Sequence, residues 1–160
     1  MVINMSFYIA IDGNSCAGKS TFAEKLYLKH SAKDSVNLFH MDDFFDDNYG
    51  RFRDEVLLPL KSGQAFTYRA YSCKTGEYRE IEVKPARINI VEGVYSLHPR
   101  FDFDYDLKIF MKVAQGEQLR RIKLRSPDLY ERFVNEWFPR ENKYFEEFKI
   151  ADKCDFVFEF

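Results

Sequence analysis

The sequence predicts an α/β fold in which a doubly wound parallel sheet carries helices on both faces. Two observations lead to this prediction. Short apolar segments alternate with segments of helical spacing, which is typical of parallel strands joined by crossover helices. The first apolar segment also ends in a glycine turn that leads directly into a helical pattern. The length of 160 residues suits one domain, so we expect a single domain over residues 1–160.

The first elements follow from apolar spacing. Residues 7–11 are continuously apolar and end at Asp12-Gly13, which predicts a buried strand that leads into a turn. Apolar positions at helical spacing predict a helix over residues 19–30. A second strand is expected at residues 36–41, where it meets the acidic and aromatic run over residues 42–47.

The middle of the chain changes period. Residues 52–61 have the pattern of a helix that ends near Gly63, because glycine readily adopts the left-handed conformation that closes a helix. Alternating segments at residues 66–72 and 77–83 flank Lys74-Thr75-Gly76, a turn signal, and predict a β-hairpin. We therefore expect the hairpin as an insertion between the strands of the main sheet.

The second half returns to alternating strands and helices. An apolar strand over residues 88–91 ends at Glu92-Gly93, and another is expected at residues 107–113. The helix over residues 117–125 ends before Pro127, because the residue before a proline is disfavoured in the helical region. The remaining predictions are helices at residues 128–137 and 141–148 and a last strand at residues 155–160.

Composition excludes several classes of protein. Lys plus Arg is 24 and Asp plus Glu is 26, a formal net charge of −2, so we expect no nucleic-acid partner. The apolar segment near the N-terminus is far shorter than the ~20 residues of a membrane-spanning helix, so we expect no membrane partner. Cys16, Cys73 and Cys154 are widely spaced, which favours reduced thiols in a cytoplasmic protein. A homo-oligomer is left open.

The glycine turn matches the Walker A pattern, in which a glycine and four residues precede Gly-Lys-Ser. Successive backbone N–H groups of such a loop surround phosphate oxygens, and the following helix adds its positive end. Lys19 is expected to contact the β- and γ-phosphates, and the Ser20 hydroxyl to ligate Mg²⁺. The predicted nucleotide-binding residues for ATP are Gly13, Asn14, Ser15, Cys16, Ala17, Gly18, Lys19, Ser20 and Thr21.

Three further groups favour a small-molecule kinase over other nucleotide-binding proteins, since the guanine-reading Asn-Lys-x-Asp segment is missing. Asp42-Asp43 ends the second strand and places a carboxylate near the phosphate loop. Glu92 ends another strand and is expected to hold Mg²⁺ directly or through water. Arg121 and Arg125 share a helix face and could stabilise charge in the transition state, or serve only solubility.

Aromatic residues are expected around the acceptor. Phe45 lies in the acidic run, and Tyr68, Arg69 and Tyr71 alternate along the hairpin, where they could stack on a flat acceptor or pack across the strands. His40 and His98 are each interpreted as a satisfied polar group rather than a catalyst.

The motifs together resemble the uridine kinase family in order and spacing, and most closely its short bacterial uridine kinase-like members. The wider group includes phosphoribulokinase and pantothenate kinase. The likeness covers nearly the whole chain and rests on residues 13–20, 41–45, 71–73, 91–95, 119–122 and 137–145. It implies a P-loop fold with the hairpin over the acceptor site.

The resemblance also implies roles for single residues. It implies ATP-dependent phosphorylation of a sugar hydroxyl, which is the 5′-hydroxyl of uridine or cytidine in the namesakes. Asp42 would be the general base, Glu92 an acid of the metal shell, and Tyr71 a neighbour of the nucleobase. The phosphate and Mg²⁺ contacts would come from Lys19 and Ser20, and the lid arginines would be Arg121 and Arg125.

The chain departs from the family pattern at Tyr71-Ser72-Cys73, where members often have Tyr-Asp-Phe, and the segments after Asp47 and Arg125 are short. Two alternatives therefore stand beside a nucleoside kinase. The acceptor could be pantothenate or another sugar-like alcohol, or the chain could be a nucleotide-dependent binding module without acceptor chemistry.

Overall fold

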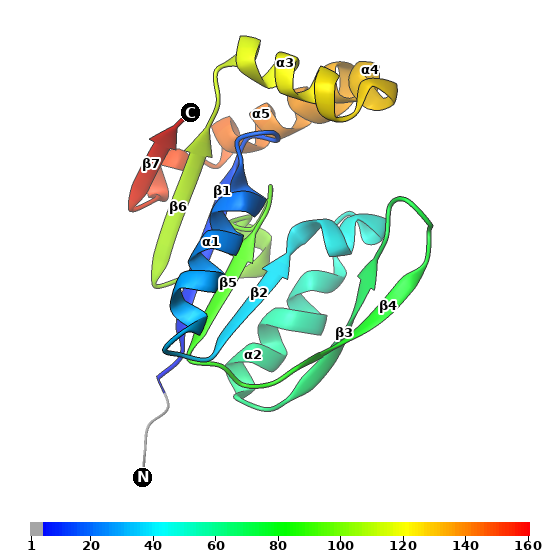
Figure 1. The fold of residues 1–160 in the computed structure, drawn as a ribbon. Coiled ribbons are helices and arrows are strands. Elements are labelled where there is room, and N and C mark those ends of the chain that lie inside the picture. Colours follow the sequence, from blue (N-terminus) through cyan, green and yellow to red (C-terminus); the bar gives the residue numbers. More distant parts are fainter. Residues whose placement is uncertain (1–4) are drawn as a thin grey trace.

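A central parallel sheet organises the protein. The computed structural model describes residues 5–160, and residues 1–4 lie outside the described residues. The five strands lie in the order β2-β5-β1-β6-β7, all parallel (Figure 1). Their bounds are β1 Phe7–Gly13, β2 Val36–His40, β5 Ile88–Glu92, β6 Leu107–Lys112 and β7 Phe156–Glu159. The predicted α/β class is confirmed.

The register of the sheet brings three strand ends together. Glu92 pairs with Ile11 of β1 on one side and with His40 of β2 on the other. The segments that follow β1, β2 and β5 therefore leave the sheet side by side at its carboxyl edge. This is the edge at which open α/β sheets bind ligands.

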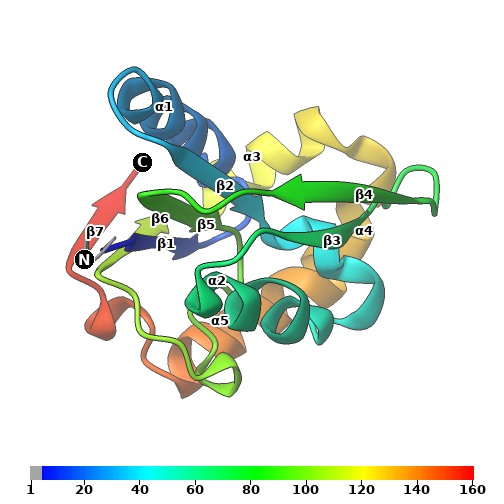
Figure 2. The ribbon, with the colours of Figure 1, turned by 90° about the horizontal axis from the view of Figure 1, so that it is seen from below.

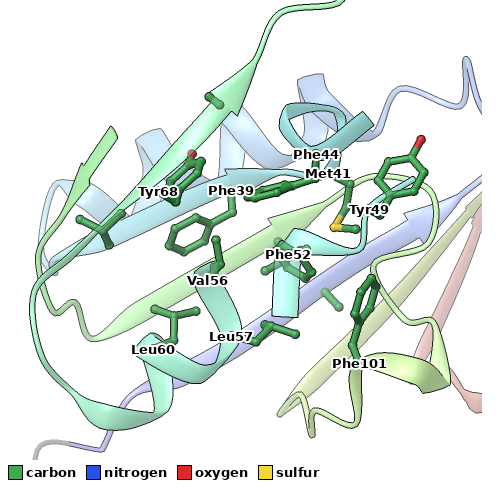
Figure 3. Close-up of a cluster of buried hydrophobic side chains, with 14 of the residues drawn as sticks. Phe39, Met41, Phe44, Tyr49, Phe52, Val56, Leu57, Leu60, Tyr68 and Phe101 are labelled. Atoms are coloured by element: carbon green, nitrogen blue, oxygen red, sulfur yellow. The ribbon is translucent and has the colours of Figure 1, made fainter. Parts of the chain in front are cut away.

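Helices cover both faces of the sheet, as expected for a doubly wound fold. Helix α1, Lys19–Ser31, lies on one face, and α2, Leu58–Ser62, lies with α5, Phe138–Glu147, on the other (Figure 2). The α1 face is packed by aliphatic side chains, among them Ile11, Ala23 and Ile109. The opposite face is strongly aromatic, with Phe39, Phe44, Phe52 and Tyr68 in one buried cluster (Figure 3). Much of the unusual phenylalanine content is therefore core.

The hairpin forms a separate two-stranded sheet beside β2. Strands β3, Phe66–Tyr71, and β4, Tyr78–Val83, pair antiparallel, with Tyr71 opposite Tyr78 (Figure 2). The preceding helical segment ends at Gly63, whose φ of 68° is the left-handed conformation expected there. Met41, expected as the last residue of the second strand, instead begins a 3-10 turn over Met41–Asp47. That turn carries the acidic run away from the sheet.

The C-terminal helices differ from the prediction. Helix α3, Gln115–Arg125, is followed by α4, Tyr130–Arg132, a π turn over Phe133–Trp137, and α5. The two helices expected at residues 128–137 and 141–148 are thus one continuous helical segment, because Trp137 keeps helical angles. Helices α3 and α4 lie beyond the carboxyl ends of the strands (Figure 1).

A wider turn explains how this segment passes a proline without breaking. The π turn ends at Trp137, just before Phe138-Pro139, and a second π turn over Arg53–Leu57 ends just before Leu58-Pro59. A proline inside an α-helix lacks the N–H donor and clashes with the carbonyl four residues back. The π turn shifts that carbonyl away from the ring.

No helix within residues 5–160 has both the length and the apolar character needed to cross a membrane. Cys16, Cys73 and Cys154 are all free thiols, as expected.

Candidate functional site

A tight loop joins β1 to α1 at the carboxyl edge of the sheet, where the glycine pattern predicted it. Gly13 has a φ of +140°, and a Cβ atom there would lie 2.1 Å from the carbonyl oxygen of Met111. Only glycine allows β1 and β6 to approach this closely as the chain turns. Gly18 has a φ of 90° directly before α1 begins at Lys19. The loop therefore ends with backbone N–H groups at a helix N-terminus, an arrangement suited to anions.

Contacts to β6 hold this phosphate loop, residues 13–20, in shape. The Asn14 backbone N–H donates to the Met111 carbonyl over 3.1 Å, and the Asn14 side chain accepts from the Val113 N–H over 3.3 Å. The Lys19 side chain is buried, and its Nζ donates to the Asn14 carbonyl over 2.6 Å. Its charge therefore lies across the mouth of the loop.

Asp12, which the sequence analysis did not single out, anchors the loop from below. It is fully buried and accepts hydrogen bonds from the backbone N–H groups of Gly13 at 2.7 Å and Leu97 at 3.1 Å. The Tyr144 hydroxyl of α5 donates to it over 2.6 Å. Burial raises the pKa of Asp12 to about 6. An aspartate inside an apolar strand, directly before the first loop glycine, was the available signal.

Glu141 is a second residue that sequence reasoning missed. Its side chain is buried, and its carboxylate accepts hydrogen bonds from both the Ser15 backbone N–H, at 3.2 Å, and the Ser15 hydroxyl. Burial raises its pKa. Glu141 and Tyr144 are three residues apart on α5 and so share a helix face. That face joins the C-terminal helices to the phosphate loop.

Ser20 and Glu92, the predicted metal ligands, lie together. The Ser20 hydroxyl donates to Glu92 Oε1 over 3.1 Å, and the Glu92 side chain is buried. His40 Nδ1 lies 2.6 Å from the same oxygen, and this hydrogen bond raises the pKa of His40. His40 is thus the satisfied polar group that was expected.

The oxygen ligands of Ser20 and Glu92 suit a Mg²⁺ ion that is bound mainly through phosphates. Hard hydroxyl and carboxylate oxygens are the ligands that Mg²⁺ prefers, and it usually needs only one or two protein ligands beside substrate phosphates. Ser20 and Glu92 supply such oxygens at the loop. Residues 5–160 contain no cluster of three or more His, Cys, Asp or Glu side chains that could hold a metal ion.

The acidic run follows β2 beside these groups. Asp42 lines the cleft described below, and desolvation together with the nearby Glu92 raises its pKa. Asp43 accepts a hydrogen bond from the Tyr68 hydroxyl over 3.1 Å. The two neighbouring carboxyl groups therefore differ in environment, with Asp43 held by the hairpin.

A cleft of about 490 Å³ lies between the acidic run, the hairpin end and the C-terminal helices, and we call it the acceptor cleft. Ser15 and Glu141 connect it to the phosphate loop. The ring of Trp137 meets the ring of Phe45 edge-on, with centroids 5.9 Å apart. The other residues that line the acceptor cleft are Asp42, Asp43, Asn48, Tyr49, Tyr71, Ser72, Cys73, Lys74, Val94, Tyr95, Arg125, Ser126, Leu129, Phe133 and Arg140.

The structure separates the predicted acceptor and lid residues. Asp42, Phe45, Tyr71 and Arg125 all line the cleft. Tyr68 is buried beneath it, where its ring stacks on Phe44 at 5.4 Å.

Arg69 and Arg121 also lie outside the lining of the cleft. Arg69 pairs over 2.8 Å with Glu55, which belongs to the helical segment before the hairpin. Arg121 donates to the Cys16 carbonyl over 2.9 Å, which ties α3 to the phosphate loop.

Comparison with known proteins places the fold. A solved structure titled a possible uridine kinase from Bacillus stearothermophilus superposes with a TM-score of 0.72 and 20% identity, covering 96% of this chain and 89% of that one. This chain has the fold of the P-loop kinases. A candidate fructose transport system kinase from Silicibacter sp. TM1040 superposes with a TM-score of 0.58 and 15% identity, covering 96% and 90% of the two chains. TT1252 from Thermus thermophilus superposes with a TM-score of 0.57 and 14% identity, covering 98% of this chain and 89% of that one.

Sequence comparison adds a curated relative with a different description. The inorganic pyrophosphatase TTM2 of Arabidopsis thaliana is 31% identical over 117 residues. The match covers 63% of this chain but only 17% of that protein. No model of a known protein family matches the chain.

Within this P-loop kinase fold, residues far apart in sequence meet at one place. Asp42 from the segment after β2, Glu92 at the end of β5, a cation from α1 and an arginine from α3 all lie around the loop or the adjoining cleft. Such a site can hold an anhydride of phosphate at the loop and a second molecule beside it.

Proposed function

We propose that the protein is an ATP-dependent kinase that phosphorylates a hydroxyl group of a small metabolite, with the 5′-hydroxyl of a nucleoside such as uridine or cytidine as the leading acceptor. One observation supports this above all. Asp42 and Arg125 line the same cleft as Ser15 of the phosphate loop, so an acid, a cation and the phosphate site adjoin one another. Phosphoryl transfer needs these parts in this proximity.

The roles of the chain's own residues follow from their positions. Lys19 and the loop N–H groups would hold the β- and γ-phosphates, and Ser20 with Glu92 would hold Mg²⁺. Bound Mg²⁺ supplies charge neutralisation on the phosphate oxygens. Asp42 would accept the proton of the attacking hydroxyl, and its raised pKa makes it a better base than an ordinary aspartate. Arg125 would stabilise the charge on the transferred group.

The aromatic walls of the cleft support a flat acceptor. Phe45, Tyr71 and Trp137 present rings to the cavity, and a nucleobase can stack on such surfaces. Ser72 and Cys73 also line it, at the position where the chain departs from the uridine kinase pattern. Pantothenate or a sugar-like alcohol therefore stays the alternative acceptor.

The test is a panel of acceptors assayed by ADP release, run with the wild type and with Asp42→Asn. General-base catalysis is typically worth ~10²–10⁴-fold, so Asp42→Asn should lower kcat in that range and leave the affinity for ATP nearly unchanged. Asp47→Asn is the matched control, because Asp47 is an exposed acid of the same segment. If Asp42→Asn turns over as fast as the wild type, Asp42 is not the general base. If the wild type releases no ADP with any nucleoside, the leading acceptor is rejected.

A second candidate function is hydrolysis of a phosphate anhydride, with water in place of the alcohol. The relative described as an inorganic pyrophosphatase favours it. Phosphate release from pyrophosphate or ATP that does not rise with any acceptor would select this function. Robust acceptor-dependent ADP production would select the kinase, and would also rule out a nucleotide-dependent binding module.

A further inference from the structure

A smaller hollow of about 210 Å³ continues from the acceptor cleft, and we call it the side pocket. Its walls include Tyr49, Tyr95 and Arg140, which also line the acceptor cleft, so the two spaces share a boundary. Arg100 and Lys143 lie beyond this shared wall. A molecule seated in the acceptor cleft can therefore extend a substituent into the side pocket.

The side pocket is rich in positive charge. Arg100, Arg140 and Lys143 line it, against Glu147 as its only acid among the described residues. Arg100 donates through one nitrogen to the Asn48 carbonyl over 2.6 Å, and Arg140 makes a long ion pair of 3.3 Å with Glu136. Lys143 makes no side-chain hydrogen bond or ion pair within residues 5–160. Most of the cationic donors are thus free to meet a ligand.

Two tyrosines of the shared wall, Tyr49 and Tyr95, have hydroxyls without protein partners among the described residues. Tyr49 is only 9% exposed, and its ring packs in the aromatic cluster while its hydroxyl points away from it (Figure 3). Within the described part of the chain, the hydroxyls of Tyr49 and Tyr95 form no hydrogen bond with another residue. Both hydroxyls are therefore available to donate a hydrogen bond to a ligand.

The backbone holds both tyrosines in place at some cost. Tyr49 has a φ of 66° and Tyr95 a φ of 77°, the left-handed region that residues other than glycine seldom occupy. Their rings lie 5.1 Å apart, so the two hydroxyls come from one aromatic pair. Such strained positions tend to occur at binding sites.

We propose that the side pocket binds an oxyanion, either a phosphate monoester or a carboxylate, carried by the acceptor molecule. This inference rests on the proposed kinase function, and among the acceptors considered there it favours an anionic one, such as pantothenate, over a neutral nucleoside. Guanidinium, ammonium and phenol groups are all donors, and oxyanions accept from several donors at once. Asp42, Asp43 and Glu141 line the acceptor cleft and not the side pocket, so the carboxylates lie where the hydroxyl would react.

Binding is tested with ribose, ribose 5-phosphate and ribonate, titrated by amide NMR at saturating Mg²⁺ and ADP so that the phosphate loop is filled. Charge-assisted hydrogen bonds contribute enough that we expect at least one anionic probe to bind ~10-fold or more tightly than ribose. Ribose 5-phosphate and ribonate distinguish a phosphate from a carboxylate as the preferred group. Equal affinity for all three probes would overturn the proposal.

Substitutions in the side pocket test where the anion binds. Arg100→Ala combined with Lys143→Ala should remove the preference for the anion, while ribose binds as before. Tyr49→Phe should reduce the preference and leave the fold intact, because the ring stays in the core. The control is Lys123→Ala, an exposed cation on α3 that lines neither space. An anion preference that survives in the Arg100 and Lys143 variant would place the anion elsewhere and refute the side pocket.

Failure of this inference is distinguishable from failure of the kinase proposal. Anion binding without ADP production from any acceptor would retain the side pocket and reject the kinase. ADP production from neutral acceptors, with no preference for anionic ones in binding or in KM, would retain the kinase and reject the side pocket.

Discussion

Glu141 places a carboxylate against the loop that would receive phosphates. It accepts two hydrogen bonds from Ser15, and it lies close enough to Lys19 for the two charges to attract each other. A carboxylate here would repel a triphosphate, and low local polarity strengthens that repulsion. The contact therefore opposes nucleotide binding while it holds α5 on the loop.

Replacement of Glu141 by Gln should tighten the binding of Mg²⁺·ATP. Loss of the negative charge is expected to contribute at least roughly 1 kcal/mol, or about fivefold in Kd, since two unit charges ~4 Å apart interact on this scale even in bulk water. Calorimetric titration of the wild type and of Glu141→Gln measures the difference, with Glu146→Gln on the exposed side of α5 as control. Weaker binding by Glu141→Gln would show that the carboxylate scaffolds the loop instead.

Asp12 should make stability depend on pH. Burial raises its pKa from 3.8 to about 6, so the folded protein binds this proton more tightly than the unfolded chain. Stability from this group is therefore full below pH 4 and is lost as the pH rises to about 6, by about 3 kcal/mol in total. Denaturant unfolding of the wild type and of Asp12→Asn between pH 4 and 7 measures it. A pH slope unchanged by Asp12→Asn would contradict the prediction.

At the scale of elements, helix α3 gives its two arginines different tasks. Arg121 donates to the Cys16 carbonyl of the loop, whereas Arg125 lines the cleft with its guanidinium 5.7 Å from the Phe133 ring centroid. Arg121→Ala should therefore raise the KM for ATP several-fold, because the phosphate loop loses the hydrogen bond that holds it to α3. Arg125→Ala should lower kcat by ~10²-fold or more with little change in that KM, as expected for loss of a transition-state donor.

Steady-state kinetics on both variants, with Lys123→Ala between them as control, separates these tasks. If both variants change the same parameter, the two arginines act alike and the distinction drawn from their contacts is wrong.

At the scale of the whole molecule, the acceptor cleft is closed by parts that are distant in sequence. Phe45 follows β2, Tyr71 ends β3, and Phe133 and Trp137 come from the π turn before α5. Trp137 is the single tryptophan of the chain, and its ring contacts both Phe45 and Phe133. It is a natural reporter of what enters the cleft.

An acceptor that binds in the cleft should therefore change the emission of Trp137. The titration is followed by tryptophan fluorescence at saturating Mg²⁺ and ADP, and Trp137→Phe should abolish the signal while acceptor-dependent ADP release continues. Unchanged emission at acceptor concentrations that saturate turnover would place the acceptor outside this cleft.

Local patterns were sufficient for most of the fold. Apolar runs predicted the strands of the main sheet, and Gly63 and Gly76 marked a helix end and a hairpin turn, because these features depend on neighbouring residues. The break expected between residues 137 and 141 was wrong, since the π turn lets the helix continue past Pro139. Spacing alone does not reveal such a turn.

The sequence by itself determined the glycine loop, the acids that follow β2 and the acid that ends β5, because a glycine turn after a strand and the parallel sheet place them on one edge. Only the tertiary structure decided which side chains complete the site. Ser15 and Glu141 are 126 residues apart, and Asp12 and Tyr144 are 132 apart. These contacts depend on how α5 docks on the loop, and that docking is set by packing across the whole core rather than by any local pattern.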